Sequence, residues 1–67
     1  MALGRAIREV RQARGLSQEA LALLAEVDRA HVGRVERGDS NAAVLTLAQI
    51  ARALNLTLAK LMQKAGL

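Results

Sequence analysis

The sequence contains no cysteine, proline, phenylalanine, tryptophan or tyrosine, and it has a single histidine. Without cysteine the chain forms no disulfide and no thiolate metal site. Without aromatic residues, an apolar core has to be built from leucine, isoleucine, valine, alanine and the two methionines. This composition favours helices and disfavours β-sheet.

Long apolar runs are also missing. Uncharged stretches such as residues 41–51 are far shorter than the roughly 20 residues that a membrane helix needs. Residues 1–4 lack the apolar segment of a secretory signal. One histidine, no carboxylate cluster and no glycine-rich phosphate loop leave no catalytic constellation. We therefore expect a cytoplasmic protein with no membrane contact, no enzymatic activity, no cofactor and no metal site.

Charge and length both point to partners. Ten basic and six acidic residues give a net charge of +4, which predicts a polyanionic partner such as double-stranded DNA. Residues 1–38 hold seven arginines and no lysine; arginine suits forked contacts with phosphate and guanine, although genome composition is an alternative explanation. We expect a single domain, residues 1–67. A domain of this size buries only about 60% of its unfolded surface, so a second copy of the chain is an expected partner.

Apolar residues at helical spacing predict five short helices in a compact all-α fold. The first three are expected at about residues 3–14, 18–25 and 29–37. The fourth has a predicted buried face of Val44, Leu47, Ile50, Ala51 and Leu54, and the fifth an apolar stripe of Leu58, Leu61, Met62 and Ala65. Predicted N-caps are Ser17, Asp28 and Thr57, and predicted C-terminal stops are Gly15, Gly38 and Asn55.

The second and third predicted helices, within residues 18–37, form a helix-turn-helix because about three residues join them. A projection of the third helix at 100° per residue turns Val32 and Val35 inward. The opposite face combines arginines with small residues, as a helix in the major groove requires. The predicted base contacts are Arg29, Ala30, Gly33 and Arg34, and the alternative for the arginines is a solvated surface role.

The chain resembles the Cro/repressor-like (XRE) helix-turn-helix family in Arg-Gly-Leu-Ser-Gln-Glu at residues 14–19, Val-Glu-Arg-Gly at 35–38 and a leucine-rich tail after Asn41. Residues 27–37 are further similar to the recognition helix of restriction-modification controller proteins. The resemblance implies a five-helix lambda-repressor-like fold. It also implies a phosphate contact by Gln18 and an ion pair between Arg11 and Glu36. Other expected phosphate contacts are Ser17, His31, Arg37 and Asn41, with a plain surface or loop role as the alternative for His31 and Asn41.

Glu26 departs from the family pattern. The turn after the second helix commonly has glycine in a left-handed conformation, and a side chain there costs about 1 kcal/mol. We therefore expect a different turn geometry, which leaves the tilt of the third helix open.

The fourth and fifth helices are the expected dimer interface, because Leu45 projects away from the buried face of the fourth helix. The expected interface residues are Leu45, Gln49, Leu58, Leu61 and Met62, and the alternative is that the fifth helix only completes the core. These features predict a sequence-specific transcriptional regulator that binds a palindromic operator as a homodimer. A protein-interaction module such as an antitoxin, which binds a partner protein through the fourth and fifth helices, is the rival function.

Overall fold

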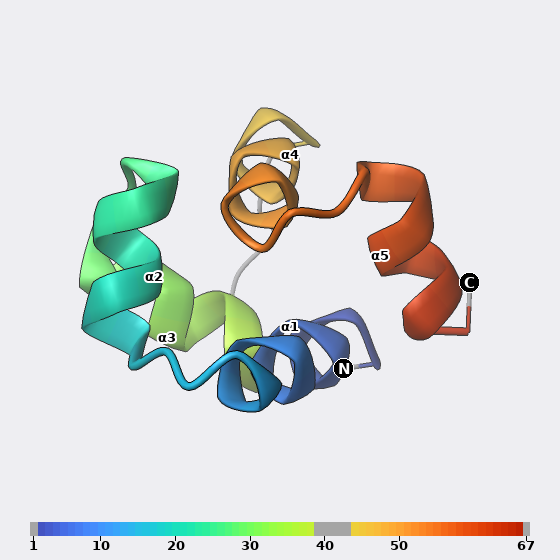
Figure 1. Ribbon diagram of the computed structural model, residues 1–67, viewed down its shortest axis with the longest axis horizontal. Coiled ribbons are helices and arrows are strands. Elements are labelled where there is room, and N and C mark those ends of the chain that lie inside the picture. Colours follow the sequence, from blue (N-terminus) through green and yellow to red (C-terminus); the bar gives the residue numbers. More distant parts are fainter. Residues whose placement is uncertain (1, 39–43, 67) are drawn as a thin grey trace.

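The computed structural model describes residues 2–38 and 44–66, which form five α-helices and, within these two ranges, no strand. The helices are α1 (Ala2–Ala13), α2 (Gln18–Ala25), α3 (Arg29–Arg37), α4 (Val44–Ala53) and α5 (Leu58–Lys64) (Figure 1). The expected all-α five-helix fold is therefore confirmed. The first three helices lie within one residue of their predicted bounds.

The five helices close into a ring around one apolar core. Neighbours around the ring are α1 and α3, α3 and α2, α2 and α4, α4 and α5, and α5 and α1, so the last helix packs against the first (Figure 1). Each helix contributes to the same buried cluster, whose largest fully buried members are Ile7, Leu21, Val32, Val35, Ile50, Leu54 and Leu61. Aliphatic side chains alone fill this core, as the absence of aromatic residues requires.

Three helix connections repeat one backbone design. Each consists of a left-handed residue, a half-buried apolar residue and a helix N-cap, at residues 15–17, 26–28 and 55–57. In each, the amide of the apolar residue donates to a carbonyl five residues earlier, which closes a Schellman motif. These bonds run from Leu16 to Arg11 (3.0 Å), from Val27 to Ala22 (3.0 Å) and from Leu56 to Ala51 (2.8 Å).

The expectation of a different turn after α2 is wrong. Glu26 has φ 59° and ψ 41°, which is the left-handed conformation that glycine usually provides. Its amide donates to carbonyls of α2, and the next residue, Val27, packs against the core. These contacts offset the strain of about 1 kcal/mol that a side chain meets there, and the turn keeps the family geometry.

Two of the three predicted N-caps bind through their side chains. Ser17 Oγ accepts from the Ala20 amide at 3.0 Å, and Thr57 Oγ1 accepts from the Lys60 amide at 3.1 Å. Asp28 occupies the N-cap position of α3, yet its side chain makes no capping hydrogen bond.

The crossing of α1 over α3 depends on Gly4. This residue is buried, and a Cβ built on it would clash with the carbonyl oxygens of Val35 and Glu36. Only glycine therefore lets α1 approach the last turn of α3 this closely.

One predicted core residue is on the surface. Val44 is 69% exposed, although it shares a helical face with the buried Leu47 and Ile50. A helix buries a face only where neighbouring helices run alongside it, and the core does not extend to the first turn of α4.

Candidate nucleic-acid interface

A hollow of about 400 Å³ lies over the outer face of α3, and we call it the α3 hollow. It is lined by the start of α2 and by one face of α3. All four predicted base-contact residues and two of the predicted phosphate contacts line it: Gln18, Arg29, Ala30, Gly33, Arg34 and Arg37. The structure thus brings together on one surface most of the residues that the sequence singles out.

A second hollow of about 440 Å³ adjoins the first, because Gln18 and Arg29 line both. Its other lining residues are Arg11, Ser17 and Glu19. It lies at the start of α2, where unpaired backbone amides and the helix dipole favour an anion. The two hollows together extend from the start of α2 along α3, and their charged lining consists of four arginines and Glu19.

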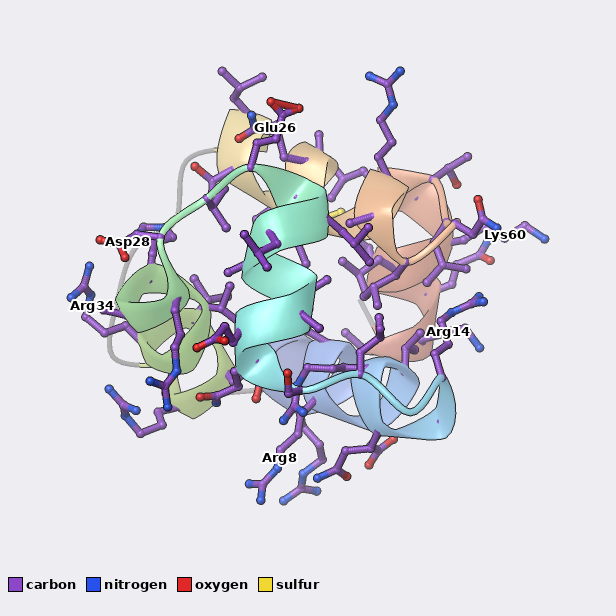
Figure 2. The ribbon with its side chains drawn as sticks, turned by 60° about the vertical axis from the view of Figure 1, so that its left-hand side comes forward. Arg8, Arg14, Glu26, Asp28, Arg34 and Lys60 are labelled. Atoms are coloured by element: carbon purple, nitrogen blue, oxygen red, sulfur yellow. The ribbon has the colours of Figure 1, made fainter. Side chains whose placement is uncertain are left out.

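The side chains of α3 differ in how far they project. Arg29, Ala30, Arg34 and Arg37 are exposed, and Arg34 points outward, away from α2 (Figure 2). Guanidinium groups donate forked hydrogen bonds and match the O6 and N7 acceptors of guanine as well as phosphate oxygens. The exposed face of α3 is therefore equipped to bind acceptors.

The predicted exposure of Gly33 is wrong. The projection of α3 places it on the exposed face, whereas in the structure it is buried. A Cβ built on Gly33 would lie 3.2 Å from Arg37 Nη1 and 3.6 Å from Gln18 Oε1. Gly33 forms the floor of the α3 hollow, and two polar side chains cover it because it has no side chain of its own.

Beneath the surface, the predicted ion pair between Arg11 and Glu36 is present. Arg11 Nε donates to Glu36 Oε2 at 2.6 Å, and Arg11 Nη2 donates to Glu36 Oε1 at 3.0 Å. The pair is buried, with side-chain exposures of 10% and 3%. Arg11 Nη1 also donates to the Leu16 carbonyl at 2.8 Å, which ties the ion pair to the turn before α2.

Gln18 extends this network to the surface. Its Nε2 donates to Glu36 Oε1 at 3.1 Å, so the Glu36 carboxylate accepts three N–H groups. A buried carboxylate with this many donors is well compensated. The network joins α1, α2 and α3 at the edge of the α3 hollow.

The remaining predicted phosphate contacts have different surroundings. Ser17 is exposed, and its Oγ accepts from Ala20, which leaves the hydroxyl hydrogen for donation. His31 Nε2 is buried and has no hydrogen-bond partner among the described residues, so only Nδ1 is left for the predicted contact. Asn41 lies outside the described residues.

The predicted dimer residues separate into exposed and buried groups. Leu45 is 72% exposed and Met62 is 37% exposed, whereas Gln49 and Leu58 are half-buried. Leu61 is fully buried in the chain's own core, so its assignment to an interface is wrong. The apolar stripe of α5 packs against α1 and α4 and so closes the ring.

Two exposed leucines were missed by the sequence reasoning. Leu23 and Leu24 in α2 are 75% and 60% exposed. A helix of two turns buries only a few residues on one side, and in α2 these are Leu21, Ala22 and Ala25. The number of apolar residues in so short a helix therefore indicates that some of its leucines are exposed. Leu24 and Gln49 line a hollow of about 340 Å³ between α2 and α4.

A metal-binding cluster and a single membrane-spanning helix are both absent from the described residues. Within residues 2–38 and 44–66, no group of three or more histidine, aspartate or glutamate side chains could hold a metal ion. No single described helix is long and apolar enough to cross a membrane. Only α4 and α5 taken together pass that test, and they are bent by 87° at the break between them.

Comparison with known proteins agrees with this geometry. The family model described as Helix-turn-helix (HTH_3) matches residues 7–61. The control protein C.SmaI of Serratia marcescens is 39% identical over 61 residues, which are 91% of this chain and 73% of that protein.

Solved structures give the same result. The restriction-modification controller protein C.AhdI from Aeromonas hydrophila is 43% identical, with a TM-score of 0.87 over 90% of this chain and 91% of its own. The clp gene regulator ClgR from Corynebacterium glutamicum is 29% identical, with a TM-score of 0.91 over 97% of this chain and 83% of its own.

Proposed function

The chain belongs to the helix-turn-helix family HTH_3, and from this premise we propose that it is a sequence-specific transcriptional regulator of the controller type, which binds a palindromic operator as a homodimer. Both C.SmaI and C.AhdI, which cover most of this chain, are named as control or controller proteins. The proposed place of action is the cytoplasm, and the proposal requires no cofactor, metal or catalytic step.

The observation that carries the proposal is the α3 hollow. Three arginines and Gln18 surround the small residues Ala30 and Gly33 on one face of α3. Small residues allow the helix backbone to approach base edges, and arginines reach guanine and the flanking phosphates. We assign base contacts to Arg29, Ala30 and Arg34, with Gly33 as the floor that lets the helix approach closely.

Phosphate contacts complete the proposed interface. Ser17, Gln18 and Arg37 lie at the edges of the α3 hollow or of the hollow beside it. Each phosphate that the protein neutralises lowers the slope of log K against log salt by about 0.9. Binding should therefore weaken steeply as the salt concentration rises.

The exposed apolar side chains support a two-fold dimer, which is also the form that a palindromic operator would require. Dimeric helix-turn-helix proteins place their recognition helices about 34 Å apart, which matches successive major grooves on one side of DNA. Leu24 and Leu45 supply exposed apolar side chains on α2 and α4, and the polar Gln49 lies beside Leu24, with Leu58 and Met62 of α5 as further candidates.

Selection of bound duplexes from a random-sequence library tests the DNA-binding proposal. The wild type should enrich a palindrome whose half-sites lie about one helical turn apart, and Arg29→Ala should blur one position in each half-site. Arg14→Ala is the matched control, because Arg14 and Arg34 project toward opposite sides of the molecule (Figure 2). Enrichment of no sequence by the wild type would contradict the proposal.

The second candidate function is a protein-interaction module such as an antitoxin. The exposed Leu23, Leu24, Val44 and Leu45 are the observation that favours it. Sedimentation of the wild type and of Leu45→Lys separates the two candidates. A dimer that the substitution converts into a folded monomer supports the homodimer, whereas a wild-type monomer that co-purifies with another small protein in fixed ratio supports the module.

A further inference from the structure

We propose that Gln18 reads a base: its side-chain carbonyl accepts a hydrogen bond from an exocyclic amino group, adenine N6 or cytosine N4, in the major groove. The inference rests on the proposed function, because it adds one specificity-determining contact to the same DNA interface. It goes beyond the phosphate contact that the family resemblance implies for this residue.

The buried Glu36 carboxylate fixes the orientation of the Gln18 amide. The Glu36 side chain is 3% exposed, and both of its carboxylate oxygens accept hydrogen bonds from Arg11. The group that faces it at 3.1 Å must therefore be the amide nitrogen of Gln18, as the structure has it. Glu36 acts here as a positioning residue.

With the nitrogen held by Glu36, the carbonyl oxygen takes the other side of the amide. A Cβ built on Gly33 would lie 3.6 Å from Gln18 Oε1 and 3.9 Å from Nε2. The amide thus lies over Gly33, on the floor of the α3 hollow, at a distance where an added Cβ would be in van der Waals contact with it. Gly33 and Glu36, one turn of α3 apart, together place the carbonyl where a base edge would enter.

The chemistry of the hollow makes this carbonyl distinctive. Of the side chains that line the hollow in the described part of the chain, the three arginines only donate, and Ala30 and Gly33 offer no polar atom. Gln18 Oε1 is thus the acceptor among these lining side chains. In the major groove only adenine and cytosine present an amino donor, so this acceptor selects one of them at one position of each half-site.

A phosphate could not use the same atom, because phosphate oxygens are acceptors as well. The backbone amides in the first turn of α2, which a helix leaves without an intrahelical partner, remain suited to a phosphate. Base readout by the Gln18 side chain and phosphate binding at the start of α2 are therefore compatible.

The test compares the sequences selected from a random duplex library by the wild type, Gln18→Met and Gln18→Lys. Methionine has similar length but no amide, and lysine keeps a donor that binds phosphate. We expect the wild type to prefer adenine or cytosine at one position per half-site, and both variants to lose that preference by about fivefold or more while other positions stay unchanged. Arg14→Ala is the control that should keep every preference.

Three other outcomes would overturn the inference. If Gln18→Lys binds as tightly as the wild type with all base preferences intact, Gln18 contacts only phosphate. If both variants weaken binding equally at all sequences, the role of Gln18 is structural, and far-ultraviolet circular dichroism would show the loss of helix. If the wild type itself selects no sequence, the proposed function fails together with the inference.

Discussion

The two sides of the helical ring are held together by different chemistry. Where α1 meets α3, the contact contains a buried ion pair, the Gln18 amide and a glycine against backbone carbonyls. In α4 and α5, the buried residues are all aliphatic, and α5 contributes a single fully buried side chain, Leu61. Both sides belong to one core, yet among the described residues the side-chain hydrogen bonds that join one helix to another lie on the first side.

The difference shows that some contacts fix the relative orientation of helices, whereas others only hold the helices together. Apolar packing is non-directional, whereas hydrogen bonds with charged partners fix distances and angles. The side that carries the α3 hollow therefore holds α2 and α3 in a defined relation, as base readout requires. The side made by α4 and α5 keeps exposed apolar residues such as Leu45, which suits a surface that a second copy covers.

The largest expected effect comes from breaking the ion pair. Arg11→Met leaves the Glu36 carboxylate buried with Gln18 as its main donor, so the free energy of unfolding should fall by about 3 to 5 kcal/mol. A domain of this size rarely has more than about 3 to 5 kcal/mol in total, so the variant should be largely unfolded. Urea denaturation followed by circular dichroism measures this.

The double variant Arg11→Met with Glu36→Leu is the matched control for that experiment. Because it removes both charges, it should recover part of the lost stability. A single variant within about 1 kcal/mol of the wild type would show that the pair is solvated and that this side of the ring has no special polar support.

Gly4→Ala should have the next largest effect. The added Cβ would push α1 away from the carbonyls of Val35 and Glu36, for an expected loss of about 1 to 3 kcal/mol. Gly15→Ala is the comparison: no atom lies within 4 Å of its built Cβ, but φ is 70°, so the loss should be about 1 kcal/mol. Equal thermal shifts for the two variants would mean that the helices separate freely at Gly4.

Substitution of the N-cap residues Thr57 and Asp28 should have smaller effects on stability, and it compares the two sides of the ring. Thr57→Ala removes the acceptor for the Lys60 amide and should lower stability by about 1 kcal/mol. Asp28→Ala should lower it by only about 0.3 kcal/mol, because Asp28 makes no capping bond and contributes through the helix dipole alone. Thermal melts of the two variants would reverse this order if Asp28 caps α3 in solution.

One small expected effect is a gain in stability. Glu26→Gly removes a side chain from a left-handed position and should raise stability by about 0.5 kcal/mol, or about 2 to 4 °C in Tm. Asn55→Gly should gain less, because asparagine tolerates this conformation better than glutamate does. A loss of stability in Glu26→Gly would mean that the Glu26 side chain makes a favourable contact that outweighs the strain.

The helices and their ends were predictable because local rules determine them. Apolar spacing and capping residues placed the first three helices within one residue of their observed bounds, and Ser17 and Thr57 cap as expected. The α2–α3 turn was not predictable from Glu26, because the hydrogen bonds and the burial of Val27 that hold it depend on the folded chain. A local preference of about 1 kcal/mol loses to such contacts.

The sequence predicted which residues line the candidate site better than it predicted which of them are buried. Helical projection gathered Arg29, Ala30 and Arg34 on one face, which the structure also does. It could not show that Gly33 is covered, because the covering side chains belong in part to another helix. It also could not show that Leu61 faces the chain's own core, because an apolar stripe has the same pattern against either partner.

The closed ring has a consequence for how the molecule opens. In an open bundle the outermost helix can detach by giving up one contact, whereas here every helix lies between two neighbours. Fraying of α5 would therefore expose α1 and α4 together, and the loss would reach α3 through the Gly4 crossing. The five helices should behave as one foldon, in which the slowest-exchanging amides of all helices report the same global unfolding free energy.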